Sequence, residues 1–110
     1  MSDVETIEIS MEQAKAQIEK RRALGRLQTN PDFKQLILDG YMKDHAIHLV
    51  LLKASMGAQG PKDQAYIENQ INAIGHLDQY LSYVDQTGRV AAETLEADEK
   101  ERARILEEEA

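Results

Sequence analysis

The sequence contains no cysteine and no tryptophan, and it has only one phenylalanine and two prolines in 110 residues. Without cysteine, the chain cannot form disulfides, thiolate metal sites, iron–sulfur clusters or a thiol nucleophile. Because aromatic residues make up only 5% of the chain, a core must consist mainly of Leu, Ile, Val, Ala and Met. That composition suits helices better than a sheet, so we expect one small all-α domain.

Long hydrophobic runs and a basic leader are also missing. The first residues, Met1-Ser2-Asp3-Val4-Glu5, are acidic where a signal peptide would be basic. No apolar run approaches the roughly 20 residues that a membrane-spanning helix needs. We therefore expect an intracellular protein without a membrane partner.

Acidic residues exceed basic ones by 20 to 13, for a formal net charge of -7. Residues 93–110 alone hold eight acids and three bases, which leaves -2 for the rest of the chain. Such a balance argues against direct nucleic-acid binding, which depends on Lys and Arg neutralising phosphates. One basic cluster stands out, and it is either a solvated helix face or a contact for the acidic tail of another subunit: Lys20, Arg21, Arg22 and Arg26.

The N-terminal half predicts an arm followed by several helices within residues 11–56. Residues 1–10 are too short to fold alone, and residues 4–9 carry apolar and β-branched residues with a partial alternation, so we expect an extended arm that docks on a neighbour. Ser10 with Gln13 has the spacing of a capping box, and apolar residues then recur at helical spacing over residues 11–28. The arm would make its contact through three apolar side chains: Val4, Ile7 and Ile9.

Residues that typically start or end helices predict the next two helices. Asn30-Pro31-Asp32 is a strong helix start, and Gly40 is expected to end that helix in a left-handed turn. A third helix then contains residues 46–52, which are apolar on nearly every side and predict the centre of the core. The second helix should bury Phe33, Leu36, Ile37 and Leu38.

After a loop over residues 57–62, a long helix is expected over residues 63–96, followed by an acidic tail over residues 97–110. Helical periodicity continues to about residue 107, and an unbroken helix of that length would extend for roughly 66 Å. Either it breaks at residues 86–89, near Gly88, or its apolar seam packs on another copy of the chain. The seam, our candidate partner or oligomer interface, consists of Ile67, Ile71, Ile74, Leu77, Leu81, Val84, Ala91 and Leu95.

No motif predicts catalysis, and we expect no enzyme activity, no cofactor and no metal. His45 and His48 lie beside Asp44, but the chain offers only one further histidine, His76, and metal binding would require these side chains to converge. The acids of the tail lack an apolar wall that would shift their pKa values. Nucleotide-binding loops and nucleophile elbows are absent from the sequence.

Two stretches, residues 30–52 and Ile74-Gly-His-Leu-Asp-Gln-Tyr-Leu at 74–81, resemble a group of short acidic proteins encoded by tailed bacteriophages. The Glu-rich end is also similar to theirs. Some members of the group are encoded among virion structural genes. The resemblance implies a phage origin and a helical, virion-associated role, and it supplies no catalytic residue.

Together these observations predict a small antiparallel helical bundle or hairpin with a long C-terminal helix. Its function would be non-enzymatic. We expect a bacteriophage virion or capsid-assembly component that self-associates or docks on a larger structural protein, in the host cytoplasm during assembly or in the virion. The alternative is a small acidic phage inhibitor that binds a host enzyme.

Overall fold

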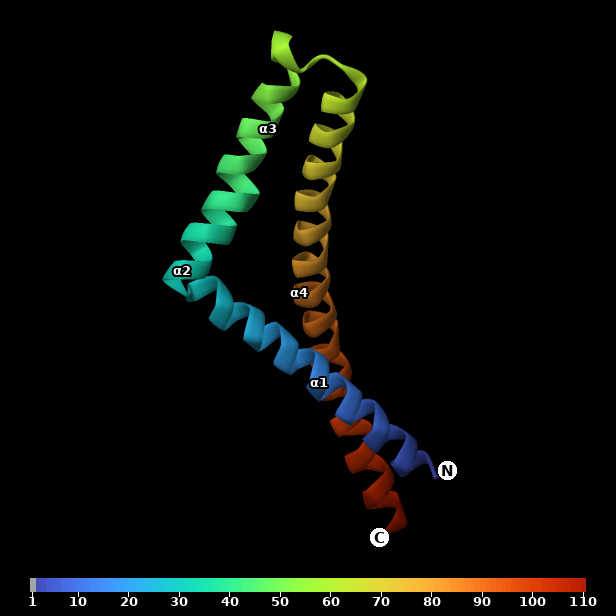
Figure 1. The fold of residues 1–110 in the computed structure, drawn as a ribbon. Coiled ribbons are helices and arrows are strands. Elements are labelled where there is room, and N and C mark those ends of the chain that lie inside the picture. The colour runs from blue at the N-terminus through green and yellow to red at the C-terminus, as the bar shows by residue number, and fades with distance from the viewer. Residues whose placement is uncertain (1) are drawn as a thin grey trace. The chain divides into compact units, whose positions relative to one another are not determined.

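The computed structural model describes residues 2–110 and is helical with no strand in that range (Figure 1). The expected all-α class is therefore confirmed. The elements are the helices α1 (Asp3–Thr29), α2 (Pro31–Phe33), α3 (Ala46–Lys53) and α4 (Pro61–Glu109), with a π-helix η1 (Lys34–His45) and a 3₁₀ turn η2 (Met56–Ala58).

The chain divides into two compact units, which we describe separately. Unit 1 comprises the chain up to Gly25 together with Tyr83–Ala110, and unit 2 comprises Arg26–Ser82. Unit 1 therefore pairs most of α1 with the C-terminal part of α4. Unit 2 pairs the segment from α2 to α3 with the N-terminal part of α4.

The N-terminal segment is helical, so the expected extended arm over residues 1–10 is wrong for all residues from Asp3 onward. Ser2 caps the helix, because its Oγ accepts a hydrogen bond from the Glu5 backbone N–H at 3.2 Å. Asp3 and Glu5 also place negative charge in the first turn, where the helix dipole favours it. The β-branched residues of this segment favoured an extended conformation. However, Val4, Ile7 and Met11 follow one another at helical spacing, and the segment forms the start of α1.

The helix start at Asn30 is confirmed. Its side chain accepts hydrogen bonds from the backbone N–H groups of Asp32 (2.9 Å) and Phe33 (3.1 Å), and Pro31 occupies the first turn. A proline there loses no hydrogen bond, because the first N–H groups of a helix have no internal partner. The Asn30 cap thus fixes where α2 begins.

Gly40 does not end a helix, which corrects the expected turn. It lies inside η1, and no residue within 2–110 has a positive φ. A π-helix bonds each residue to the fifth along, so its side chains repeat about every four to five residues. Leu36 consequently leaves the buried side and is 66% exposed, contrary to expectation. Half-buried side chains recur instead at spacings of four and five, at Phe33, Ile37, Leu38, Tyr41, Met42 and Ala46.

The core of unit 2 joins α3 to the first turns of α4. Its buried members are Leu49, Ala58, Ile67 and Ile74. Gln64 fixes the connection, because its Nε2 donates to the backbone carbonyls of Lys53 (3.0 Å) and Ala58 (2.7 Å). The partly buried residues packed against this core are Tyr41, Met42, Ala46, Leu52 and Ile71.

In unit 1, α1 and the last part of α4 lie side by side (Figure 1). Three polar pairs join them: Glu8 with Arg102 (3.3 Å), Ser10 with Asp98 (2.7 Å) and Arg21 with Asp85 (3.0 Å). Residue numbers fall along α4 as they rise along α1, so the two segments run in opposite directions. The residues buried in unit 1 include Met11, Ala14, Leu24, Gly88 and Ala91.

Gly88 continues α4 without interruption, so the alternative of a break at residues 86–89 is wrong. The glycine instead allows a close approach of the two helices. A Cβ atom at this position would lie 2.4 Å from the Arg21 Cβ and 2.9 Å from the Arg21 Cδ. Gly88 is therefore required because only a residue without a side chain lets the two helices pack this closely, and not because the chain turns there.

Candidate interaction surfaces

The apolar seam of α4 faces inward in both units. Ile67, Ile74 and Ala91 are buried, and Ile71 packs against the core of unit 2. The remaining predicted seam residues are half-buried: Leu77, Leu81, Val84 and Leu95. Burial inside the chain leaves Ile67 and Ile74 almost no surface that another molecule could reach, whereas Ala91 lines an open groove between α1 and α4. For the half-buried seam residues, the assignment to a partner or oligomer interface stays a prediction.

The three apolar residues of the predicted N-terminal arm differ in how far they are buried. Val4 and Ile7 are half-buried on α1, whereas Ile9 is exposed. Ile7 and Ile105 line an open depression of about 470 Å³ at the ends of α1 and α4. The other lining residues are mainly charged, namely Asp3, Thr6, Glu101, Arg104, Glu108 and Glu109.

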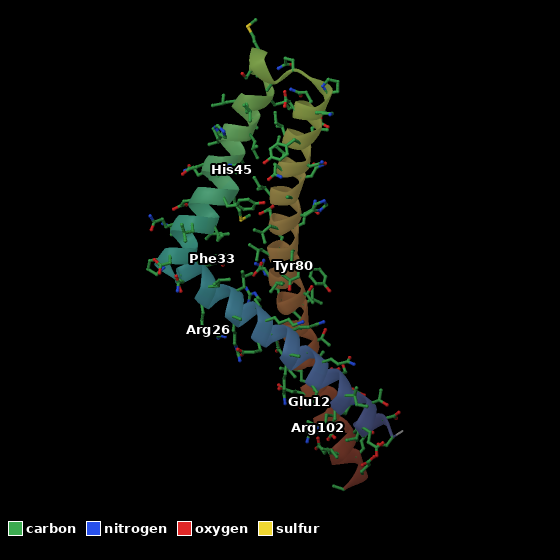
Figure 2. All side chains as sticks on the ribbon, viewed as in Figure 1. Glu12, Arg26, Phe33, His45, Tyr80 and Arg102 are labelled. Atoms are coloured by element: carbon green, nitrogen blue, oxygen red, sulfur yellow. The ribbon has the colours of Figure 1, made fainter. Side chains whose placement is uncertain are left out.

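The acidic tail belongs to α4 and is neutralised in part by its own arginines. Arg102 reaches Glu8 on α1, and Arg104 pairs with Glu101 and with Glu108 (2.7 Å) in the same helix. The hydrogen bond from Arg104 lowers the pKa of Glu101 and raises that of Arg104 itself. Because these groups are exposed, each pair stabilises the helix only slightly. The tail is thus a helical part of unit 1, and Figure 2 labels Arg102 on this C-terminal part of α4.

Asp85 is held by two arginines, and this predicts an acid-dependent loss of stability. The hydrogen bond from Arg21 is the main cause that lowers the pKa of Asp85 below its ordinary value of 3.8, with Arg89 adding to it. A carboxyl whose pKa is lower when folded stabilises the fold above its unfolded pKa, and that contribution is lost as the pH falls through the folded value. We expect thermal melts between about pH 6 and pH 2 to show a slightly smaller acid-induced drop for Asp85→Asn than for the wild type. Equal drops would contradict the pairing.

One face of α3 is apolar and uncovered. Ile47, Val50 and Leu51 are 52%, 59% and 67% exposed, and their spacing of three and four residues places them on one side of the helix. The opposite side, with Leu49, faces the core. The sequence predicted that residues 46–52 are contacted from more than one side, but residues 2–110 cover only the side with Leu49. We call Ile47, Val50 and Leu51 the α3 stripe.

A second surface feature is an open groove of about 430 Å³ in unit 1, between α1 and α4. Its floor includes the buried residues Ala14 and Ala91, and Val90 is 48% exposed beside them. The lining residues are all uncharged: Ser10, Gln13, Ala14, Gln17, Tyr83, Gln86, Thr87, Val90, Ala91 and Thr94. We call this the unit 1 groove.

Sequence reasoning missed both surfaces. For the stripe, the signal was present in the all-round apolar character of residues 46–52. For the groove, the only signal was a set of uncharged residues at helical spacing in two segments far apart in the sequence, which no local pattern connects.

The histidines do not converge. His45 on η1 stacks with Tyr41 (ring centroids 5.9 Å apart) and with His48 (6.2 Å), while His76 is exposed on α4 (Figure 2 labels His45). Over residues 2–110, no three His, Asp or Glu side chains are arranged to hold a metal ion. Over the same residues, no helix combines the length and apolar character needed to cross a bilayer.

Comparison with protein-family models finds no match for the chain, and comparisons with curated proteins and with solved structures find none either.

Proposed function

We propose that this chain is a non-enzymatic helical interaction protein that docks on a larger structural protein through the α3 stripe and also self-associates. The observation that carries the proposal is the exposure of Ile47, Val50 and Leu51 side by side on one helix. Contiguous apolar side chains on a small domain mark an interaction surface when nothing in the chain covers them. An amphipathic helix face of this kind fits an apolar groove on a partner.

The charge distribution supports docking through unit 2. Residues 26–82 carry five basic and six acidic side chains, for a net charge of -1, whereas the rest of the chain carries -6. A partner that covers the α3 stripe therefore meets little electrostatic repulsion, whatever the sign of its own charge.

The phage assignment belongs to the same proposal. Residues 30–52, which resemble short acidic proteins of tailed bacteriophages, include the entire α3 stripe. We propose a virion or capsid-assembly component, present in the host cytoplasm during assembly or in the virion, with no enzymatic activity. The opposite directions of the paired helix segments support the antiparallel bundle or hairpin that we propose for its architecture.

The test compares two leucines of equal exposure in unit 2. Leu51 lies in the stripe and is 67% exposed, and Leu36 lies outside it and is 66% exposed. We expect Leu51→Asp to abolish capture of a phage structural protein from infected cells, identified by mass spectrometry, while Leu36→Asp captures it like the wild type. Circular dichroism would verify that both variants remain folded.

The same experiment can overturn the proposal. Equal capture by wild type and Leu51→Asp would remove the stripe from the interface. Capture of a host enzyme, released by moderate salt and insensitive to Leu51→Asp, would instead favour an acidic inhibitor that acts through the tail.

A further inference from the structure

The unit 1 groove is uncharged in a unit that is otherwise highly charged. Charged side chains make up 22 of the 53 residues that form unit 1, yet none of them is among the ten that line the groove. The lining is drawn from both helices, over residues 10–17 of α1 and 83–94 of α4. The two helices thus present one continuous uncharged surface.

Three side-chain amides of the groove have no hydrogen-bond partner within the part of the chain that the structure describes, whereas the Ser10 hydroxyl donates to Asp98 (2.7 Å). Within residues 2–110, the structure gives no hydrogen bond to the side-chain amides of Gln13, Gln17 and Gln86. An amide carries donors and an acceptor together, as a hydroxyl does. A surface made of such groups can pair with an identical surface, which a face of charges of one sign cannot do.

Unit 1 has an uneven distribution of charge along its helices. The part containing residues 15–25 and 83–92 holds five basic and two acidic side chains, a net charge of +3. The part containing residues 2–14 and 93–110 holds twelve acidic and three basic side chains, a net charge of -9. Unit 1 is therefore basic toward one end and strongly acidic toward the other.

The core of unit 1 is also small. Its buried hydrophobic residues include Met11, Ala14, Leu24 and Ala91, two of them alanines. Two helices packed on each other bury only one face each, and a second pair of helices would complete a four-helix bundle. The groove is the open face over which such a pair would lie.

We propose that the unit 1 groove binds a second copy of itself, with the two copies in opposite directions about a two-fold axis. This deepens the self-association part of the proposed function. A two-fold interface brings the same patch of each copy together, and the uncharged amides and hydroxyls of the groove suit that arrangement. The opposite directions place the basic end of each copy against the acidic end of the other, so electrostatic attraction fixes the orientation.

The test introduces one charge into the groove and one beside it. Val90 lines the groove, whereas Ala92 is exposed on the same helix and does not line it. We expect the wild type to be a dimer by light scattering coupled to size exclusion. Val90→Glu should weaken dimerisation by about tenfold or more, because it buries an unpaired charge at the interface, while Ala92→Glu should remain dimeric.

Salt tests the orientation of the two copies. In the proposed arrangement, unlike charges face each other, so raising the NaCl concentration should weaken the dimer. If the copies ran in the same direction, acidic end against acidic end, salt would strengthen it. A dimer that tightens with salt would therefore overturn the proposed orientation.

Two other results would overturn the proposal, and they can be told apart from failure of the α3 stripe. A wild type that stays monomeric at the highest soluble concentration, or equal masses for Val90→Glu and Ala92→Glu, would exclude the groove as the interface. If Leu51→Asp dissociates the dimer and Val90→Glu does not, self-association runs through the stripe and the groove proposal is wrong. If Leu51→Asp abolishes partner capture but leaves the dimer intact, both proposals stand.

Discussion

Ile67→Ala is expected to lower the free energy of unfolding by about 2–5 kcal/mol, the usual range for removing a buried aliphatic side chain. Ile67 is 1% exposed and lies in the unit 2 core with Leu49, Ala58 and Ile74. The loss combines the transfer free energy of the deleted methyl and methylene groups with the cavity that remains. We expect the upper part of the range, because two of the three other buried members are large and cannot collapse into the gap without leaving their own contacts.

The matched control is the same substitution at a residue of the same type. Ile47 is 52% exposed on α3, and alanine has the better helix propensity, so Ile47→Ala should change stability by less than about 0.5 kcal/mol. Urea unfolding followed by circular dichroism measures both variants. Similar losses for the two would mean that Ile47 is covered in solution, and a neutral Ile67→Ala would contradict the assignment of α4 to this core.

Local chemistry made parts of the fold predictable. The Asn30 side chain caps its helix in the expected way because the cap depends only on the next three residues. The all-α class followed from a composition poor in aromatic residues. These features depend on short-range propensity, which a sequence displays directly.

The π-helical hydrogen-bonding pattern of η1 was not predictable, because the choice between a π-helix and an α-helix depends on packing between segments far apart in the sequence. Under an α-helical repeat, Leu36 shares a face with Phe33, which is why it was expected to be buried. The π-helical repeat of η1 turns Leu36 outward and leaves Gly40 within the helix. A Cβ at Gly40 would lie 2.9 Å from the backbone oxygen of Gln35, so the glycine permits this winding without adopting a turn conformation.

The candidate surfaces were predictable only in part. The sequence predicted the apolar seam of α4 as a partner or oligomer interface, yet its buried members are covered within the chain, where Ile67 and Ile74 join the core with Leu49 of α3. Ile47, Val50 and Leu51 became exposed for the complementary reason: only one side of an all-round apolar helix meets a partner within the chain. A sequence shows how much apolar surface exists, and the topology decides which part remains uncovered.

Gly88→Ala is expected to destabilise the protein by about 1–2 kcal/mol, even though alanine favours helices over glycine. The added Cβ would lie 2.4 Å from the Cβ of Arg21, and neither atom is the flexible end of a side chain. The backbones of α1 and α4 must therefore move apart, which weakens the packing of Leu24 and Ala91 nearby. The overpacking cost exceeds the gain in helix propensity.

Gly25 and Gly75 provide the controls for this substitution. Both lie inside helices, and a Cβ at either position would have nothing within 4 Å. Alanine there should raise stability by roughly 0.5–1 kcal/mol, because it restricts the unfolded chain and favours the helix. Thermal melting of the three variants measures the change in stability for the same Gly→Ala substitution at each position. We expect a loss of stability at Gly88 and a gain at Gly25 and Gly75. A rise in melting temperature for all three would mean that α1 lies farther from α4 at Gly88 than the structure places it, and α4 would then have no packing reason for a glycine at that position.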